Sequence, residues 1–317
     1  MREALVLNAV IMPVIGLVLF FSAGVIAQDR IVKKSADSRG KVVYRYGSDD
    51  SWSPVKKRLL KLLNDYRDHR IGVSLINLSS NREVYAFNAN SPLEPASIMK
   101  IITSAVALKT LSPHFRFKTD FVVDKFENGR VNKMYVIGSG DPVLTVDSLW
   151  MIARKFASRG IRSIETLALD TSMHQDKVSR QGQRAFEAGT SALALNFNSV
   201  GFEVCPAAVG QRASVKRDPP EYPVVLKGSI ITNSRNRSKF YIDELSRGDS
   251  WPQVYRLRGS ISRYQECETI YRSVSNPERY FAEVFVGLLK SEGVRVGEVV
   301  FNGRAPESGR VLYSHKS

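Results

Sequence analysis

The feature that most constrains the fold is a strongly apolar segment between residues 97 and 111. Pro92 and Pro95 precede it and Pro113 follows it, so a helix with defined ends is predicted. Its apolar side chains cover most of the helix circumference, and a helix of this kind is normally buried on several sides. These side chains are Ile98, Ile101, Ile102, Ala105, Val106 and Leu108. Further secondary structure is therefore expected to surround this helix.

Extended segments and other helices alternate along the rest of the chain. Hydrophobic periodicity and capping residues predict a helix that starts at Ser53-Pro54, a β-hairpin over 71–88, strands around Phe121 and over 131–137, a helix over 146–158 that Gly160 ends, and a last helix that starts at Asn276-Pro277 and ends at Gly293. Extended segments separated by Gly, Pro and Asn fill the stretch before the last helix. The fold class predicted from this alternation is α/β (α+β).

The first 27 residues form a segment of their own. The stretch 4–27 is almost entirely apolar and ends in Val25-Ile26-Ala27, with small residues where signal peptidase cuts. A signal peptide over 1–27 is predicted, and cleavage after Ala27 is favoured over an uncleaved membrane anchor. Residues 28–52 are polar and basic and predict a linker. We therefore expect an exported protein, in the periplasm or elsewhere in the cell envelope.

The chain is basic, with 46 Lys and Arg against 31 Asp and Glu and a formal net charge of +15. Such a charge attracts polyanions. Because export is expected and no recognised nucleic-acid-binding motif is present, we expect association with anionic wall material or the membrane surface, and no binding of nucleic acid.

The chain has two cysteines, Cys205 and Cys267. They either form a disulfide or remain as two buried thiols, and the sequence does not decide between these two states.

The pattern Ser-x-x-Lys occurs three times, and the surroundings separate the copies. The copy at 38–41 lies in the linker, and helix capping explains the copy at 53–56. In the third, Ser97 starts the apolar helix and Lys100 lies one turn later on the same face. A buried lysine can take the proton of a serine hydroxyl and make it a nucleophile. On spacing alone, the commoner reading is a capping serine followed by a surface lysine.

A longer series of short motifs resembles one family. It consists of Ser74 to Leu78, Phe87 to Asn90, Pro95 to Lys100, Phe115 to Thr119, Gly138 to Pro142, Ala192-Leu193, Asn196 to Val200 and Gly293-Val294. In this order the motifs resemble the D-alanyl-D-alanine carboxypeptidase/endopeptidase family, the class C low-molecular-mass penicillin-binding proteins. These are serine peptidases with an S-x-x-K motif, and the resemblance covers most of the chain from about residue 55.

The resemblance implies an incomplete β-lactamase/transpeptidase-like domain with a large mixed α/β insertion. The expected divisions are a signal peptide 1–27, a linker 28–52, the first part of the transpeptidase-like domain 53–118, the inserted domain 119–300, and a truncated return to the first domain 301–317.

The resemblance also implies the site residues: Ser97 matches the acylated serine and Lys100 its base. Peptidoglycan peptides are the implied substrates and β-lactams the implied acylating ligands. No cofactor and no metal is expected, and the scattered histidines lack metal-site spacing.

The chain departs from the family pattern after the insertion. K-T-G is absent from the sequence, and S-x-N occurs only at 79–81 and 234–236, in polar stretches where chance explains it. The family's K-T-G strand binds the substrate carboxylate and supplies one oxyanion-hole N–H, and losing one such donor costs orders of magnitude in rate. Loss of the following strands would also leave apolar surface of the Ser97 helix uncovered.

Two functions of different class follow from these observations. The first is a carboxypeptidase/endopeptidase-like serine peptidase that acts on peptidoglycan peptides through an acyl-enzyme on Ser97 and is impaired by truncation. The alternative is a non-catalytic wall-binding or scaffold protein derived from the same family. The intact pair Ser97 and Lys100 favours the first, and the two missing motifs favour the second.

Overall fold

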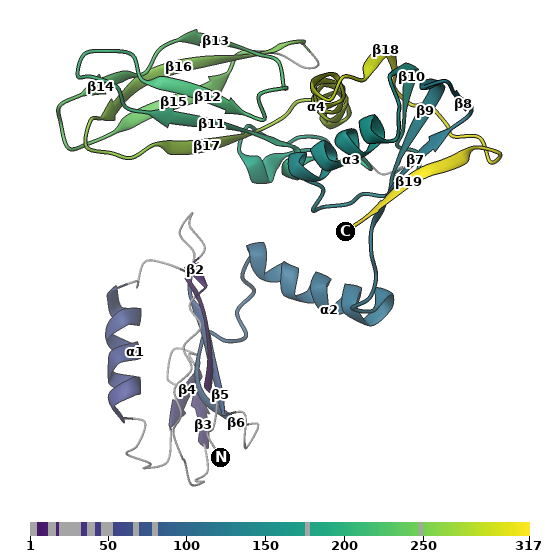
Figure 1. Cartoon of the computed structure of the whole chain (residues 1–317). Helices are drawn as coiled ribbons and strands as arrows, with labels where there is room; N and C mark the ends of the chain where they lie inside the picture. Colours follow the sequence, from purple (N-terminus) through teal and green to yellow (C-terminus); the bar gives the residue numbers. More distant parts are fainter. Residues whose placement is uncertain are drawn as a thin grey trace. The chain divides into compact units, whose positions relative to one another are not determined.

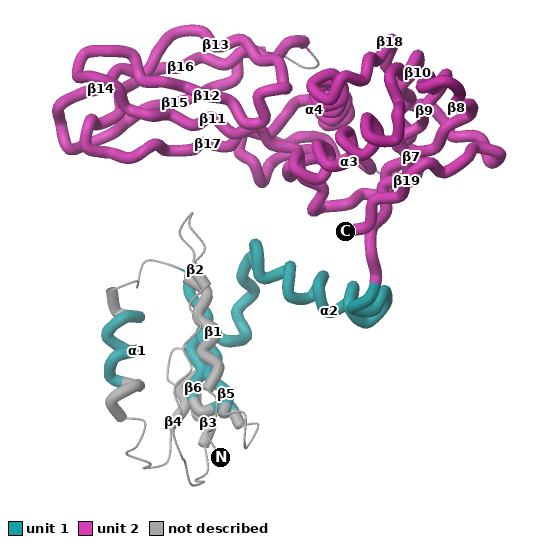
Figure 2. Tube along the Cα trace, in the orientation of Figure 1, with its two compact units in different colours: residues 1–114 teal, residues 115–317 magenta. Residues whose placement is uncertain are grey.

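A computed structural model describes residues 5–11, 17–18, 33–36, 42–45, 53–65, 70–77, 82–174, 178–246 and 250–317. The chain divides into two compact units, unit 1 over residues 1–114 and unit 2 over residues 115–317 (Figure 2). Most of the expected signal peptide and linker lies outside the described residues. Among the residues described, no helix combines the length and the apolar character needed to cross a membrane.

Unit 1 contains two helices and a hairpin that the sequence predicts. The sheet order is β2-β1-β5-β6, with β5 and β6 antiparallel, and β3 pairs with β4. Ile71, Val73 and Leu75 bury their side chains beside Leu59 of helix α1. The elements are β1 (Leu5–Ile11), β2 (Leu17–Val18), β3 (Lys33–Ala36), β4 (Val42–Arg45), α1 (Ser53–Asp65), β5 (Gly72–Asn77), β6 (Arg82–Phe87), the 3-10 turn η2 (Ala96–Ile98) and α2 (Met99–Leu111).

Helix α2 differs from the expectation that it is buried. None of its side chains is buried, and Ile101 and Ile102 are 63% and 59% exposed. The sequence pattern specifies a helix that is apolar all round, but burial requires partner elements, and the described residues of unit 1 place none over it. The exposed helix matches the other expectation, that apolar surface around Ser97 is uncovered.

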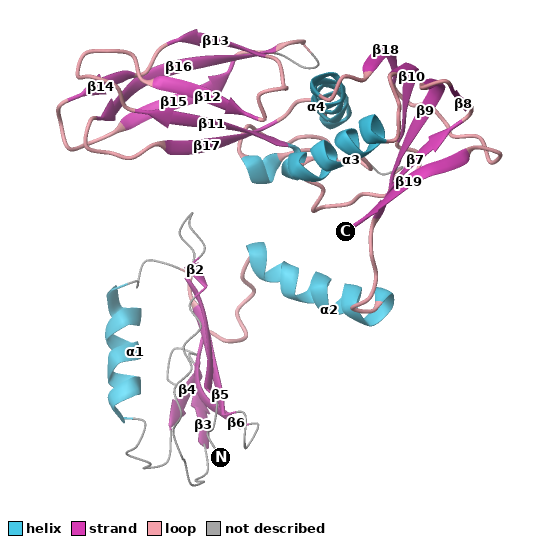
Figure 3. Ribbon diagram, in the orientation of Figure 1, coloured by secondary structure: helices cyan, strands magenta, loops and turns pink. Residues whose placement is uncertain are grey.

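The first part of unit 2 is a sheet covered by two helices (Figures 1 and 3). The strand order is β18-β10-β9-β7-β19, β10 runs parallel to both neighbours, and β8 pairs with β9. Phe121 on the sheet meets Phe156 and Phe285 on the helices, with ring centroids 5.2 and 5.5 Å apart. The elements are β7 (Lys118–Val123), β8 (Phe126–Glu127), β9 (Arg130–Gly138), α3 (Val146–Ser158), β10 (Ser163–Asp170), α4 (Pro277–Ser291), β18 (Arg295–Val300) and β19 (Arg310–Lys316).

Both helices of unit 2 begin and end where the sequence predicts. The Asn276 side chain accepts a hydrogen bond from the Arg279 backbone N–H at 3.0 Å and caps α4, with Pro277 in its first turn. Thr145 caps α3 in the same way. Gly160 and Gly293 follow the helix ends with φ of 87° and 80°, a conformation that glycine adopts without steric cost.

The second part of unit 2 is made of two further sheets that share an apolar core. One has the order β12-β11-β17, and the other has the order β13-β16-β14 with β15 also on β16. The rings of Phe202 and Tyr255 meet at 4.8 Å in the core. The elements are the 3-10 turns η3 (Ala185–Glu187) and η4 (Asn196–Asn198), then β11 (Ser199–Cys205), β12 (Ser214–Asp218), β13 (Val224–Gly228), β14 (Ile231–Asn233), β15 (Lys239–Glu244), β16 (Gln253–Ser262) and β17 (Glu268–Ser273).

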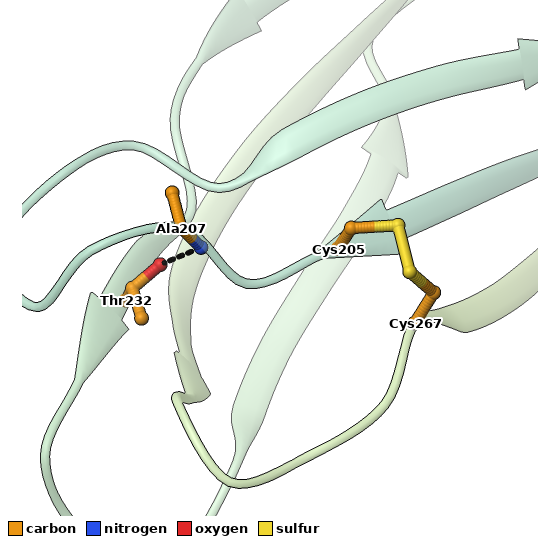
Figure 4. The surroundings of a disulfide bond; sticks show 4 residues. All are labelled: Cys205, Ala207, Thr232 and Cys267. Carbon is orange, nitrogen blue, oxygen red and sulfur yellow. Dashed lines mark hydrogen bonds between the residues drawn. A yellow bond between two sulfur atoms is a disulfide. The ribbon is translucent and has the colours of Figure 1, made fainter.

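Cys205 and Cys267 form a disulfide, which decides between the two states that the sequence left open. The bridge joins the end of β11 to the residue before β17 (Figure 4). These strands are antiparallel neighbours, so their ends lie side by side. Nearby, the Ala207 backbone N–H donates to Thr232 Oγ1 at 2.9 Å and ties the same end to β14.

The division of the chain differs from the expected one in two places. The boundary between the compact units falls after His114 rather than after Lys118, because Lys118 already starts strand β7 of unit 2. The expected return over 301–317 also lies in unit 2. Strand β19 pairs antiparallel with β7, so this segment completes the edge of the unit 2 sheet.

Candidate active site

Ser97 lies in a tight turn that leads into helix α2. Residues Ala96–Ile98 form the 3-10 turn η2, in which the Ile98 backbone N–H donates to the Pro95 carbonyl at 2.9 Å. Ser97 is therefore inside the turn and is not the N-cap that spacing alone favoured. Ala96 has a φ of 41°, a left-handed conformation that costs a non-glycine residue about 1–2 kcal/mol. No residue pattern around Ser97 predicts this strain.

The structure brings the two predicted catalytic side chains together. Lys100 Nζ donates to Ser97 Oγ at 2.9 Å. The contact follows from the local fold, because residues three apart in a helical turn present their side chains on one face. Both side chains are exposed, so the apolar surroundings that sequence analysis expected for Lys100 are not found among the described residues of unit 1.

The two literal S-x-N segments lie outside the described residues of unit 1. Residues 79–81 lie outside the described part of the chain. Ser234 and Asn236 are exposed in the loop between β14 and β15 of unit 2. Both segments remain attributed to chance, because polar loops are rich in Ser and Asn.

The motif at 138–142 is a structural junction in unit 2. Ser139 Oγ accepts from the Lys118 backbone N–H at 3.0 Å and donates to the Lys118 carbonyl at 2.6 Å. The Gly140 N–H donates to the Ala192 carbonyl at 2.8 Å. A Cβ at Gly138 would overlap that same carbonyl, so only glycine fits there. The motif thus joins β7, β9 and the segment before β11.

One group of side chains in unit 2 has metal-ligand types within reach of one another. It consists of Glu203, Cys205 and Cys267. Both sulfurs are committed to the disulfide and cannot act as thiolate ligands, so this group is not a metal site. That the protein needs no metal and no cofactor stays a prediction.

Comparison with known families and proteins agrees with the motif series. The model of the D-Ala-D-Ala carboxypeptidase 3 (S13) family matches residues 55–317. A D-alanyl-D-alanine carboxypeptidase of Actinomadura sp. (strain R39) is 26% identical over 264 residues, which are 78% of this chain and 48% of that protein. A penicillin-sensitive carboxypeptidase A of Dictyostelium discoideum is 24% identical over 240 residues, 68% of this chain and 45% of that protein.

Solved structures agree on the fold. Penicillin binding protein 4 (dacB) of Haemophilus influenzae superposes with a TM-score of 0.61 at 23% identity, over 78% of this chain and 56% of that one. The chain spans about half the length of the curated relatives that it matches. The family match covers both units from helix α1 onward and includes the turn that carries Ser97 and Lys100. The chain therefore belongs to the D-Ala-D-Ala carboxypeptidase 3 (S13) family.

Proposed function

We propose that Ser97 is the nucleophile of a serine-type D-Ala-D-Ala carboxypeptidase or endopeptidase that acts on peptidoglycan peptides. The observation that carries this proposal is the 2.9 Å contact between Lys100 Nζ and Ser97 Oγ in a chain of this family. A hydroxyl becomes a good nucleophile when a neighbouring base removes its proton. Lys100 is the described group in contact with that hydroxyl.

The proposed reaction has two steps. Lys100, in its unprotonated form, accepts the Ser97 Oγ proton while Oγ attacks the carbonyl carbon between the two D-alanines. The C–N bond breaks, the terminal D-alanine leaves with a proton, and the remaining peptide is held as an ester on Ser97. Water then hydrolyses this ester and Oγ regains its proton. A β-lactam forms the corresponding ester when its ring opens.

The exposure of the pair sets the expected rate. A base and nucleophile that lie in water lack the preorganised, water-excluded surroundings that supply much of an enzyme's rate. A strained β-lactam needs less help than a peptide, so we expect slow acylation by penicillin. We expect D-alanine release to be weaker still, at or below the limit of detection.

Intact-mass spectrometry after incubation with benzylpenicillin tests the proposal. The expected result is one penicilloyl adduct per chain, which disappears in Ser97→Ala. A D-alanine release assay measures turnover in parallel. If the wild-type chain gains no adduct but still binds isolated cell-wall sacculi, the non-catalytic wall-binding alternative replaces the peptidase.

We also propose that the protein is exported to the periplasm or cell envelope, where it associates with peptidoglycan. The apolar stretch 4–27 and the Cys205–Cys267 disulfide support this, because disulfides persist mainly outside the cytoplasm. Cell fractionation with N-terminal sequencing tests it. Mature protein that begins at Gln28 in the envelope fraction is expected, and cytoplasmic protein that begins at Met1 would overturn it.

A further inference from the structure

One face of the second part of unit 2 carries a row of basic side chains. Along β16, Tyr255 and Leu257 are buried while Arg256 and Arg258 are exposed, as strand alternation requires. Lys227 of β13 lies directly opposite Arg256, and the exposed Tyr241 of β15 lies opposite Arg258. The three neighbouring strands therefore present these residues on one exposed surface, which we call the basic face.

Arg258 is held in place on this face. Its guanidinium carbon lies 4.4 Å from the centre of the Tyr241 ring, and its Nε donates to Asp243 Oδ2 at 2.8 Å. Stacking and ion pairing together fix the orientation of the guanidinium. Its side chain is still 53% exposed, so the remaining N–H groups can reach a ligand.

The other cations of the face are not neutralised in the described structure. Lys227 and Arg256 are like charges at paired positions, an arrangement that is unfavourable without a counter-ion. Lys239 on β15 is also exposed and lies opposite Ser260 rather than an acid. Asp243, opposite Arg256, is already bound to Arg258. The described ion pairs leave Lys227, Arg256 and Lys239 without a carboxylate.

We propose that the basic face binds a linear phosphodiester polymer of the cell wall. Arg256 and Arg258 lie two residues apart on one strand, which spaces them by about 7 Å along it. Guanidinium groups in such a row fit successive phosphates of an extended chain, since each can bind a phosphate through two N–H groups. A single-stranded nucleic acid has similar charge, but the disulfide at the end of the neighbouring sheet favours a partner outside the cytoplasm. Only the location of the polymer rests on the proposed function, because binding at this face does not use Ser97.

A charge-removal variant with a matched control tests the proposal. The face variant carries Lys227→Gln, Arg256→Gln and Lys239→Gln. The control carries Lys290→Gln, Arg295→Gln and Arg310→Gln, which remove three exposed charges from the other part of unit 2. Binding of fluorescent poly(glycerol phosphate) is measured by anisotropy on the full chain at several salt concentrations, beside an oligothymidylate of equal charge and neutral dextran.

The expected result is a loss of affinity of about tenfold or more in the face variant and less than about twofold in the control. The slope of log affinity against log salt should fall by about two to three in the face variant, because the affected contacts release counter-ions. Ser97→Ala should bind as tightly as the wild type, so a failed acylation assay leaves this result standing. Equal losses in both triple variants would show that net charge alone attracts the polymer. Tighter binding to the oligothymidylate, or equal binding to dextran, would also overturn the proposal.

Discussion

Lys100 Nζ lies 2.9 Å from Ser97 Oγ, although both side chains are exposed and the helix that carries Lys100 buries none of its residues. The contact between base and nucleophile is therefore set by one turn of backbone and does not need a surrounding protein core. The polarity of their surroundings is a separate property, because only other elements of the structure can exclude water from the pair. The contact between base and nucleophile and the polarity of its surroundings can therefore be tested separately.

The contact predicts that Lys100 determines the rate at which penicillin acylates Ser97. Lys100→Met keeps most of the length of the side chain and removes the amine, so acylation should slow by about 10²–10⁴-fold, the usual contribution of a positioned base. The rate is followed by intact-mass spectrometry over time. Lys109→Met removes a lysine from the last turn of the same helix and should leave the rate unchanged. Equal slowing in both variants would mean that net charge, and not the contact, governs acylation.

Helix positions were predictable from the sequence because their signals are local. Asn276, Pro277 and Gly293 mark the ends of α4, and the side-chain cap and positive φ in the structure are the physical reasons for those residue types. The positions of Ser97 and Lys100 on one face were predictable for the same reason. Ser97 is not the cap that spacing alone favoured, since the 3-10 turn at Ala96–Ile98 moves the start of α2 to Met99.

Features that depend on distant residues were not predictable. The burial of α2 was expected from its apolar pattern, but a pattern shows only what a helix can bury and not which element covers it. The disulfide remained open because strands β11 and β17, which bring Cys205 and Cys267 together, are far apart in the sequence. The basic face arises from the pairing of β13, β15 and β16, and strand register is not contained in any short motif.

The junction at 138–142 predicts a strong dependence on Gly138. A methyl group there would overlap the Ala192 carbonyl. The carbonyl belongs to the backbone, so it cannot move aside by a side-chain rotation. Gly138→Ala should lower the free energy of unfolding of unit 2 by about 2 kcal/mol or more. A methyl group at position 160 would have no neighbouring atom within 4 Å. Gly160→Ala should therefore lower the free energy of unfolding by only about 1 kcal/mol, which is the cost of the left-handed φ of 87° for alanine. Urea unfolding measures both, and equal costs would contradict the proposed overlap.

The disulfide should stabilise unit 2 chiefly by restricting the unfolded chain. It closes a loop with a sequence separation of 62 residues, for which the chain-entropy model gives about 4 kcal/mol. Cys205→Ser with Cys267→Ser should therefore lower the unfolding midpoint in urea. A reductant should lower the wild-type midpoint by the same amount and leave the double variant unchanged. A wild-type midpoint that does not respond to complete reduction would exclude this contribution.

The cap of α4 should contribute to the stability of the main core of unit 2. Asn276→Ala removes the acceptor of the Arg279 N–H and should cost about 1 kcal/mol. Asn276→Asp keeps an acceptor at the same place and should cost much less. Thermal unfolding followed by circular dichroism compares the three proteins. An equal loss of stability in both variants would show that the side-chain nitrogen of Asn276, and not its oxygen, is needed.

Three buried tyrosines in unit 2 predict a loss of stability at high pH. Burial raises the pKa of the phenols of Tyr222, Tyr255 and Tyr280, so the folded protein keeps their protons when the unfolded chain has lost them. Above about pH 10 the unfolded state thus binds fewer protons, and the free energy of unfolding falls as pH rises, by about 1.4 kcal/mol per pH unit for each tyrosine. Below pH 10 both states hold these protons and the effect is absent.

Phenylalanine variants distinguish this titration from loss of a hydrogen bond. Tyr255 Oη is buried with no partner among the described residues, whereas Tyr280 Oη donates to the Ser199 carbonyl at 3.0 Å. Tyr255→Phe should keep or raise stability at pH 7, because it removes an unsatisfied buried hydroxyl, and Tyr280→Phe should lose about 1 kcal/mol there. Both should flatten the alkaline slope by about 1.4 kcal/mol per pH unit. Tyr264→Phe, at a 63% exposed position, should leave the stability at pH 7 unchanged. If the slope between pH 10 and 11 is the same in Tyr255→Phe as in the wild type, ionisation of this buried phenol does not contribute to alkaline unfolding.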